Sequence, residues 1–513
     1  MSLFHDVIYK NAKRFPEKTA LIIDRKAISY RELRTLANRT ATTLMRLGVK
    51  SGDSVGLYAS ISIELVACFL ALLQIGAITA ATHHTLSREK LIQQLKDAKA
   101  RILITDSTTN LEPLAFEAGL DLTFLLKPYQ SRSELIVNLQ AALDEQVGIN
   151  DHECARDRIT DDRPTSIFYT TGSTFNPKGV LVNHQIMLAA SEAVTRYLEI
   201  QPSDRVFSYS TLASDYGVYN ILMPLYVGAT SIIESQAPTT ADDVLQVVES
   251  YHVTAMHVFP PVFFLIAGAD SHWRSRVNHL RYISSSGQAL YPKHIRKIRA
   301  LFPELKIFSN YGLTECKRVS FLDPAEIDAR PDSVGKPLEE VAAFLVDDHD
   351  DLISEAGVVG ELLVGSEYLM LGYWERPDDN RKSILDNTFG QRRLYRTGDL
   401  FRRDAEGFLY YVARKDDVFT RNVWNVNPRE IEQCLISHPA VSEAVVKPIA
   451  DESAGHVPKA FVVLEKNSGY LTGQDLIEYC KRHIDWHMVP TECVLVSSLP
   501  RSDSGKSTTK GLA

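Results

Sequence analysis

Hydrophobic and polar positions along the first two thirds of the chain follow two alternating spacings. In residues 30–47 apolar side chains recur every three or four positions, which predicts an amphipathic helix. Short apolar runs, such as residues 282–286, are typical of buried strands. The predicted helices cover residues 4–14, 30–47 and 63–75, and the predicted strands cover residues 19–24, 26–29, 54–59, 101–105, 166–169, 206–209, 255–259, 282–286 and 307–310. This alternation predicts an α/β fold with largely parallel sheets.

The pattern changes after about residue 338. Strand-like runs then follow one another with few helices, over residues 342–346, 360–364, 393–396 and 408–412. They predict a β-rich subdomain, which ends at a charged break in residues 413–417. The remaining tail predicts helix, strand, strand, helix, strand, which is typical of a small α+β domain. We therefore expect a large domain over residues 1–415 and a small C-terminal domain over residues 416–513.

Composition and charge narrow the function classes. The chain has 513 residues, 45% hydrophobic and 23% charged, which is ordinary for a globular protein. Its net charge of −8 argues against a nucleic-acid partner. The six cysteines are scattered without a CxxC pair, so we expect reduced thiols in a cytoplasmic protein. The most apolar stretch, residues 63–82, contains Glu64 and Gln74 and is expected to form a buried helix and strand, with no membrane partner.

A hydroxyl- and glycine-rich segment, Tyr169-Thr-Thr-Gly-Ser-Thr-Phe-Asn-Pro-Lys-Gly-Val180, follows one predicted strand. Hydroxyls and backbone N–H groups in such a loop can surround phosphate oxygens, with a lysine supplying charge. The candidate phosphate ligands are Thr170, Thr171, Gly172, Ser173, Thr174 and Lys178. The segment is not a Walker A loop, because Lys178 lies between Pro177 and Gly179. On composition alone, a polar turn between two strands explains it equally well.

Two further motifs follow strands. Asn310-Tyr-Gly-Leu-Thr-Glu315 lies where a parallel sheet opens its ligand crevice, and there a tyrosine can stack on a base and a carboxylate can hold Mg²⁺. Asp399, in Tyr395-Arg-Thr-Gly-Asp-Leu400, can bind two ribose hydroxyls or simply cap a turn. Each motif is weak alone.

A fourth motif, Gly505-Lys506-Ser507, lies almost at the chain end. The P-loop pattern needs a glycine where Pro500 stands and a helix afterwards, so we reject that interpretation. The chain also lacks a GxGxxG after a strand and a GxSxG nucleophile elbow.

The order and spacing of these motifs resemble the adenylate-forming (ANL) superfamily of acyl-CoA synthetases, luciferase-like enzymes and amino-acid adenylation domains, over nearly the whole chain. The resemblance implies that the chain uses ATP and Mg²⁺. By this resemblance, the loop from Thr170 to Lys178 holds the β- and γ-phosphates, Tyr311 stacks on adenine and Asn310 bonds its amine. The ATP-binding set then comprises Thr170, Thr171, Gly172, Ser173, Thr174, Lys178, Gly287, Asn310, Tyr311, Asp399 and Arg414.

The resemblance also assigns catalytic roles. It implies that Thr314 contacts the α-phosphate, Glu315 binds Mg²⁺, Asp416 is a hinge, and Lys506 on the mobile small domain bridges the substrate carboxylate and the α-phosphate. A carboxylate must attack the α-phosphorus of ATP, so a lysine and a metal ion between the two anions reduce their repulsion. In the family, the small domain then turns at the hinge and a thiol takes the acyl group.

The segment from Ser214 to Asn220 falls where amino-acid adenylation domains carry the aspartate that pairs with the substrate ammonium, which is Asp215 here. The segment from Tyr311 to Ser320 is similar to stand-alone ligases that load proline onto a carrier protein. The implied substrate pocket consists of Asp215, Tyr216, Tyr219, Val258, Ser284, Ser286, Asn310 and Val319. Two tyrosines leave modest room, so we expect a small, proline-like amino acid and a carrier protein acting in trans.

Two alternatives remain open, an acyl-CoA synthetase for a non-amino carboxylic acid and a non-catalytic nucleotide-binding protein. Two departures from the family pattern also matter. Phe175 stands where the phosphate loop usually has glycine, and Val423 stands where the family has a glycine near the pantetheine route. Because valine does not readily adopt glycine conformations, thiol transfer is expected to be less certain than adenylation.

Overall fold

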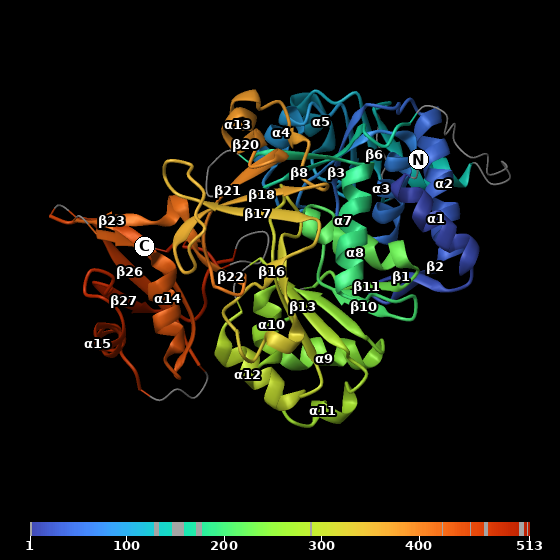
Figure 1. Cartoon of the computed structure of the whole chain (residues 1–513). Coiled ribbons are helices and arrows are strands. Elements are labelled where there is room, and N and C mark those ends of the chain that lie inside the picture. Colours follow the sequence, from blue (N-terminus) through green and yellow to red (C-terminus); the bar gives the residue numbers. More distant parts are fainter. Residues whose placement is uncertain are drawn as a thin grey trace.

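The computed structural model describes residues 3–127, 133–145, 159–170, 177–236, 238–287, 290–422, 424–451, 453–465, 470–501, 507–509 and 511–512. Within these residues the strands form four sheets (Figure 1). The first three sheets belong to residues 19–414, and the fourth belongs to the C-terminal part. Parallel-rich sheets, a β-rich subdomain and a small C-terminal domain confirm the predicted fold class.

The first sheet has, in the described residues, the strand order β16-β15-β14-β13-β12-β10-β11-β1-β2. The strands from β14 to β1 are parallel, and β2, β15 and β16 are antiparallel additions at the edges. The strands are β1 Thr19–Ile23, β2 Lys26–Ser29, β10 Arg205–Ser208, β11 Thr230–Ile233, β12 Ala255–Val258, β13 Tyr282–Ser286, β14 Lys306–Tyr311, β15 Ser320–Leu322 and β16 Lys336–Pro337.

The second sheet has, over the same described ranges, the order β19-β9-β8-β4-β3-β5-β6-β7. It is parallel from β8 to β7, and β9 and β19 are antiparallel. The strands are β3 Ser54–Tyr58, β4 Ile78–Ala81, β5 Ile102–Thr105, β6 Leu122–Leu125, β7 Ile136–Asn138, β8 Pro164–Tyr169, β9 Gly179–Asn183 and β19 Gly372–Tyr373.

One layer of helices lies between the two sheets and shares a hydrophobic core with both (Figure 1). These helices are α1 Phe4–Arg14, α2 Tyr30–Arg46, α3 Ile63–Ile75, α7 His184–Tyr197 and α8 Asp215–Val227. Every residue of α3 from Leu65 onward is buried, and β4 follows, so the apolar stretch is the expected buried helix and strand. None of the described helices is long and apolar enough to cross a membrane.

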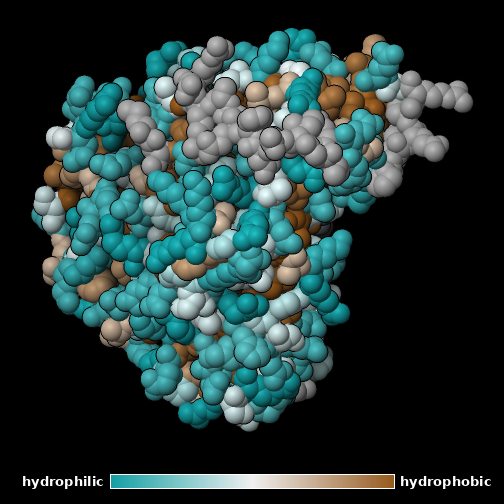
Figure 2. Space-filling view, turned by 90° about the vertical axis from the view of Figure 1, so that its right-hand side faces the viewer, coloured by the Kyte–Doolittle hydropathy of each residue, from teal (hydrophilic) through white to brown (hydrophobic). Residues whose placement is uncertain are grey.

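Further helices cover the outer faces of both sheets. On the first sheet these are α9 Ala241–Ser250, α10 Pro260–Ile266, α11 Trp273–Arg276 and α12 Pro292–Leu301; on the second they are α4 Arg88–Asp97 and α5 Leu111–Ala118, and α6 Leu139–Asp144 packs on α2. On the face to the right of Figure 1, hydrophilic residues prevail and hydrophobic residues form narrower patches between them (Figure 2).

The third sheet is antiparallel throughout and contains β17 Val341–Val346, β18 Val359–Ser366, β20 Ile384–Thr388, β21 Gln391–Arg403 and β22 Leu409–Arg414, with α13 Pro377–Ser383 beside it. The fourth contains β23 Phe419–Arg421, β24 Trp424–Val426, β25 Val441–Asp451, β26 Gly455–Leu464 and β27 Glu492–Leu495, covered by α14 Pro428–Ser437 and α15 Gly473–His483. The predicted tail pattern was wrong in omitting β23 and β24, because three-residue strands are too short to show alternation.

Candidate functional site

The predicted site residues gather at the carboxyl ends of the central strands of the first sheet. The loop between β14 and β15, residues 312–319, carries several of them. Gly312 makes this loop tight, because a Cβ at that position would lie 1.8 Å from the carbonyl oxygen of Lys317. Gly287, directly after β13, has a φ of +100°, which favours glycine. In open α/β sheets this edge is where ligands bind.

Tyr311, Asp399 and Arg414 form one connected group. The Tyr311 hydroxyl donates a hydrogen bond to Oδ2 of Asp399 at 2.5 Å, and Nη1 of Arg414 lies 2.8 Å from Oδ1. Asp399 and Arg414 are directly opposed in the β21–β22 ladder, so backbone pairing sets their approach. Burial and the nearby Asp399 raise the pKa of Tyr311, so its hydroxyl stays a donor. This group offers a buried carboxylate and an aromatic ring next to each other.

Glu315 is buried at 8% exposure and has no ion-pair partner among the described residues. Its Oε1 accepts a hydrogen bond from the Tyr373 hydroxyl at 2.8 Å, and that hydroxyl also lies 2.9 Å from the Tyr395 hydroxyl. No cluster of three or more metal-ligating side chains occurs in the described ranges. One carboxylate fits Mg²⁺ nevertheless, because this ion is usually held by one or two carboxylates together with substrate phosphates and water.

The hydroxyl- and glycine-rich segment connects β8 and β9, which pair as an antiparallel ladder. The Thr170 backbone N–H donates to the Lys178 carbonyl at 3.0 Å and closes the base of the segment. The Lys178 ammonium pairs with Asp379 at 2.7 Å and lies 5.0 Å from the centre of the Tyr373 ring. Lys178 is therefore held by a carboxylate that the sequence did not identify.

Asp215 lies at the first position of α8, whose N-cap is Ser214. Its Oδ1 accepts a hydrogen bond from the Thr314 hydroxyl at 3.1 Å, which brings two predicted site residues together. Its Oδ2 lies 3.8 Å from the ammonium of Lys317, a residue that the sequence motifs did not assign to the site. Burial lowers the pKa of Lys317, while Asp215 and Glu315 oppose that shift. Asp215 therefore already has a cationic neighbour within the chain.

The other predicted pocket residues lie on β12, β13, α8 and the loop before β15. Tyr219, Val258, Ser284, Ser286 and Val319 are buried, and Tyr216 is half-buried against Phe259. The Asn310 amide donates to the Ser284 hydroxyl at 3.0 Å and to the Ser285 carbonyl at 2.9 Å, and its oxygen accepts from the Tyr197 hydroxyl at 3.0 Å. Asn310 is thus engaged within the protein, between β13 and the end of α7.

Sequence reasoning missed two consecutive cations, Lys317 and Arg318, both buried at 8% exposure. Lys317 has a φ of +56°, an uncommon left-handed conformation for a residue other than glycine. Strained residues of this kind are concentrated at functional sites. Two adjacent cations in a loop between two buried strands were the signal that could have identified them, since lysine and arginine are rarely buried unless paired.

Several expected residues lie outside the described residues, namely Thr171, Gly172, Ser173, Thr174, Phe175, Val423 and Lys506. Asp416 is exposed on the short 3₁₀ helix η3, Lys415–Asp417, which connects the third sheet to the fourth.

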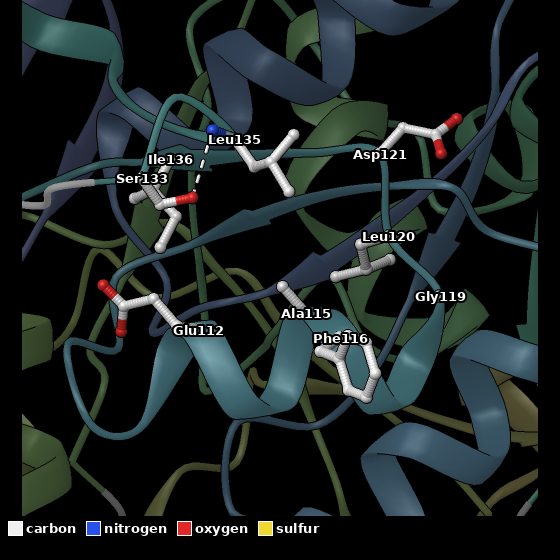
Figure 3. Close-up of a pocket in the computed structure, with 9 residues that line it drawn as sticks. All are labelled: Glu112, Ala115, Phe116, Gly119, Leu120, Asp121, Ser133, Leu135 and Ile136. Atoms are coloured by element: carbon white, nitrogen blue, oxygen red, sulfur yellow. Dashed lines mark hydrogen bonds between the residues drawn. The ribbon is translucent and has the colours of Figure 1, made fainter.

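A surface recess of about 360 Å³ lies on other elements, between α5 and the β6–β7 edge of the second sheet (Figure 3). It is lined by Glu112, Ala115, Phe116, Gly119, Leu120, Asp121, Ser133, Leu135 and Ile136. The lining contains two carboxylates and no basic side chain, which does not suit a triphosphate. The edge of the first sheet is therefore the better candidate site.

Known proteins resemble this chain over nearly its whole length. The profile described as AMP-binding enzyme matches residues 8–374, and the profile described as AMP-binding enzyme C-terminal domain matches residues 430–506. A linear gramicidin synthase polypeptide of Brevibacillus parabrevis is 27% identical over 98% of this chain, and a plipastatin synthase polypeptide of Bacillus subtilis is 26% identical over 98%. The chain spans only 6% and 19% of these two relatives.

One similar solved structure is that of the anthranilate CoA ligase AuaEII in complex with anthranoyl-AMP. Its TM-score is 0.86 at 25% sequence identity, and the match covers 99% of this chain and 95% of that one.

Proposed function

Because the chain belongs to the AMP-binding enzyme family and is therefore an ATP-dependent, adenylate-forming ligase of the ANL superfamily, we propose that its substrate is a small amino acid. The product of the first step is an aminoacyl-adenylate, formed with release of pyrophosphate. A thiol then takes the aminoacyl group, and we propose the phosphopantetheine arm of a separate carrier protein as that thiol. The particular similarity to prolyl-carrier-protein ligases stays a prediction.

The observation that carries the amino-acid assignment is the position of Asp215. Its carboxylate lies at the start of α8 and is joined to Thr314 of the loop that also bears Glu315. A carboxylate there can pair with the ammonium of an amino acid whose own carboxylate reaches the α-phosphate beside Thr314. A charge in a largely desolvated pocket needs such a partner. The gramicidin and plipastatin synthases among the relatives support this assignment.

We assign the other residues as follows. Asp399, positioned by Arg414, accepts hydrogen bonds from the ribose hydroxyls, and Tyr311 provides an aromatic face for adenine. Lys178 leaves Asp379 to reach the terminal phosphates. Glu315 would hold Mg²⁺, which supplies charge stabilisation at the phosphates when bound. Lys506 would approach from the small domain and hold the two reacting anions together.

The domain boundary and hinge are part of the proposal. Within the described residues, the strands after η3 pair with one another and not with the third sheet, and Asp416 is exposed at this junction. A rotation about Asp416 would turn residues 416–513 relative to residues 1–415. This rotation would move Lys506 out of the site and bring in the route by which the thiol reaches the adenylate.

A specific observation favours a second candidate, an acyl-CoA synthetase for an acid without an amine. Lys317 already lies 3.8 Å from Asp215, so the carboxylate does not depend on a substrate ammonium for neutralisation. The AuaEII protein, an anthranilate CoA ligase, supports this alternative.

ATP–pyrophosphate exchange with matched substrates separates the two candidates. Each small amino acid, proline included, is compared with the acid that lacks only its amine. Our proposal predicts at least tenfold higher kcat/KM for the amino acid of the best pair. Higher kcat/KM for the deamino acids would favour the acyl-CoA synthetase, and no exchange with any of these acids would contradict the proposal of a small amino-acid substrate.

A further inference from the structure

The acidic and basic side chains around the candidate site are equal in number, but not all of them are paired. Its charged side chains are Asp215, Glu315, Asp399 and Asp379 on the acidic side and Lys178, Lys317, Arg318 and Arg414 on the basic side. Three ion pairs join six of them, Lys178 with Asp379, Arg414 with Asp399, and Lys317 with Asp215. Among the described residues, Glu315 and Arg318 remain without an ion-pair partner. We have assigned Mg²⁺ to Glu315, so Arg318 is the charge that still requires a ligand.

Arg318 is more than nine-tenths buried, and its side chain makes no hydrogen bond to any described residue. Its guanidinium carbon lies 6.0 Å from the centre of the ring of Tyr216, a pocket residue. Tyr216 is uncharged, so it does not neutralise the guanidinium.

Arg318 is therefore a buried cation without a counter-ion in the part of the chain that the structure describes. A cation of this kind forms an incomplete anion site. Leaving a buried donor or charge unpaired is costly, and the cost is removed when an anion arrives.

We propose that Arg318 binds a second acidic group of the substrate, so that the substrate is a small amino acid with an acidic side chain. This inference rests on the proposed adenylation function and narrows its substrate class. The planar guanidinium matches a carboxylate with two parallel hydrogen bonds, and the pair replaces the contact that Arg318 lacks within the chain. The α-carboxylate remains at Thr314 for adenylation, and the ammonium remains at Asp215.

The ring that Arg318 contacts, Tyr216, belongs to the predicted substrate pocket and donates its hydroxyl to the Val258 carbonyl at the end of β12. Arg414, in contrast, is fixed to Asp399. The proposal therefore predicts that a change at Arg318 alters the KM of the acid and leaves the KM of ATP nearly unchanged.

The test is ATP–pyrophosphate exchange by the full chain with aspartate, asparagine, succinate, succinamate and proline, and with the glutamate and glutamine pair. Comparing each acidic substrate with its amide tests the Arg318 site. Comparing aspartate with succinate, which lacks the amine, tests the amino-acid assignment, so each of the two claims can fail without the other. We expect wild type to prefer an acidic amino acid over its amide by at least thirtyfold in kcat/KM. In Arg318→Met this preference should fall to within threefold, and Arg318→Lys should retain part of it.

Arg276→Met is the matched control, because Arg276 is an exposed residue of α11 paired with Glu249. It should leave the ranking unchanged. If proline or an amide is the best wild-type substrate, or if Arg318→Met keeps the acid preference, the inference is wrong. A fall in ATP affinity alone in Arg318→Met would also overturn it. Should Arg318→Met fail to fold, the wild-type ranking of acids and amides still decides.

Discussion

The nucleotide half and the acyl half of the site differ in how their charges are satisfied. In the nucleotide half, Asp399 has both Arg414 and Tyr311, and Lys178 has Asp379. In the acyl half, the cations Lys317 and Arg318 exceed the single carboxylate of Asp215. Asp399 and Lys178 therefore have ion-pair partners without a ligand, whereas Arg318 needs an anion. An unpaired buried charge is therefore the best indication of the substrate, because the substrate is expected to carry the opposite charge.

The two halves also differ in how the backbone positions them. Asp399 and Arg414 are opposed residues of an antiparallel ladder, so their register is fixed by backbone hydrogen bonds. Lys317 and Arg318 lie in a loop that depends on Gly312 and on a left-handed Lys317. Backbone pairing in a ladder gives a rigid site for ATP, the ligand that does not vary. A strained loop tolerates different side chains at its positions, and these can suit a different acid substrate.

The largest expected effect comes from Lys506, which is proposed to lie between the nucleotide half and the acyl half of the site. Lys506→Ala should lower adenylation by about two to four powers of ten, because a preorganised charge between two reacting anions is lost. The KM of ATP should change far less, since the other proposed ATP contacts lie on the large domain. Pyrophosphate exchange measures both, and Lys481→Ala, at an exposed small-domain lysine, is the control. Near-normal exchange in Lys506→Ala would remove Lys506 from this role.

The second largest effect is expected in the acyl half, at Asp215. Asp215→Ala should lower kcat/KM for the preferred amino acid by about a hundredfold, because the substrate ammonium loses its partner, at about 1.4 kcal/mol per tenfold. It should also reduce stability, because Lys317 is stranded in the core. The double variant Asp215→Ala/Lys317→Met separates these effects. We expect it to regain stability in urea unfolding and to remain impaired in exchange.

Asp328→Ala, at an exposed aspartate paired with Arg299, is the control for Asp215→Ala. If the double variant recovers full kcat/KM, Asp215 serves only to neutralise Lys317. The amino-acid assignment would then lose its main support.

A smaller effect is expected in the nucleotide half. Asp399→Asn should raise the KM of ATP about tenfold, since it replaces a charge-assisted hydrogen bond with a neutral one. The ranking of acid substrates should stay the same, because the acyl half is untouched. Asp348→Asn changes a highly exposed partner of Lys415 and serves as control. A changed acid ranking in Asp399→Asn would contradict the separation of the two halves.

The smallest effect concerns pH and stability. His257 accepts or donates hydrogen bonds with Asn220 and Tyr282, and burial, helped by the charge of Arg318, lowers its pKa to about 3. In the unfolded chain its pKa is about 6.5, so below that pH the unfolded state binds a proton that the folded state does not. Stability should therefore fall as the pH decreases from about 6.5 towards 3.

Urea unfolding of wild type and His257→Gln at pH 7 and pH 5.5 measures this contribution. Wild type should lose about 1 kcal/mol more than His257→Gln between the two pH values. His349→Gln, at an exposed histidine, should behave like wild type. Equal losses in His257→Gln and wild type would show that His257 is not buried in its neutral form.

Much of the architecture could be predicted from the sequence. The 3.6-residue and two-residue spacings identified α2, α3 and the central strands of the first sheet within a few residues of their observed ends. They could not identify β23 and β24, because three residues contain no period.

The contacts of the site were harder to predict. The approach of Lys317 to Asp215 joins positions 102 residues apart and depends on one left-handed residue, which no spacing indicates. Likewise, the partner of Lys178 lies on α13, far along the chain. Motif order identified which residues meet, whereas the balance of their charges became visible only in three dimensions.

The most direct test of the account is a crystal structure of the protein with a non-hydrolysable aminoacyl-adenylate analogue made from its best exchange substrate. The account predicts the ribose hydroxyls at Asp399, the substrate ammonium within hydrogen-bond distance of Asp215, and the acidic side chain on Arg318. A structure in which Asp215 keeps only Lys317 while the amine lies elsewhere, and Arg318 contacts no part of the ligand, would contradict it.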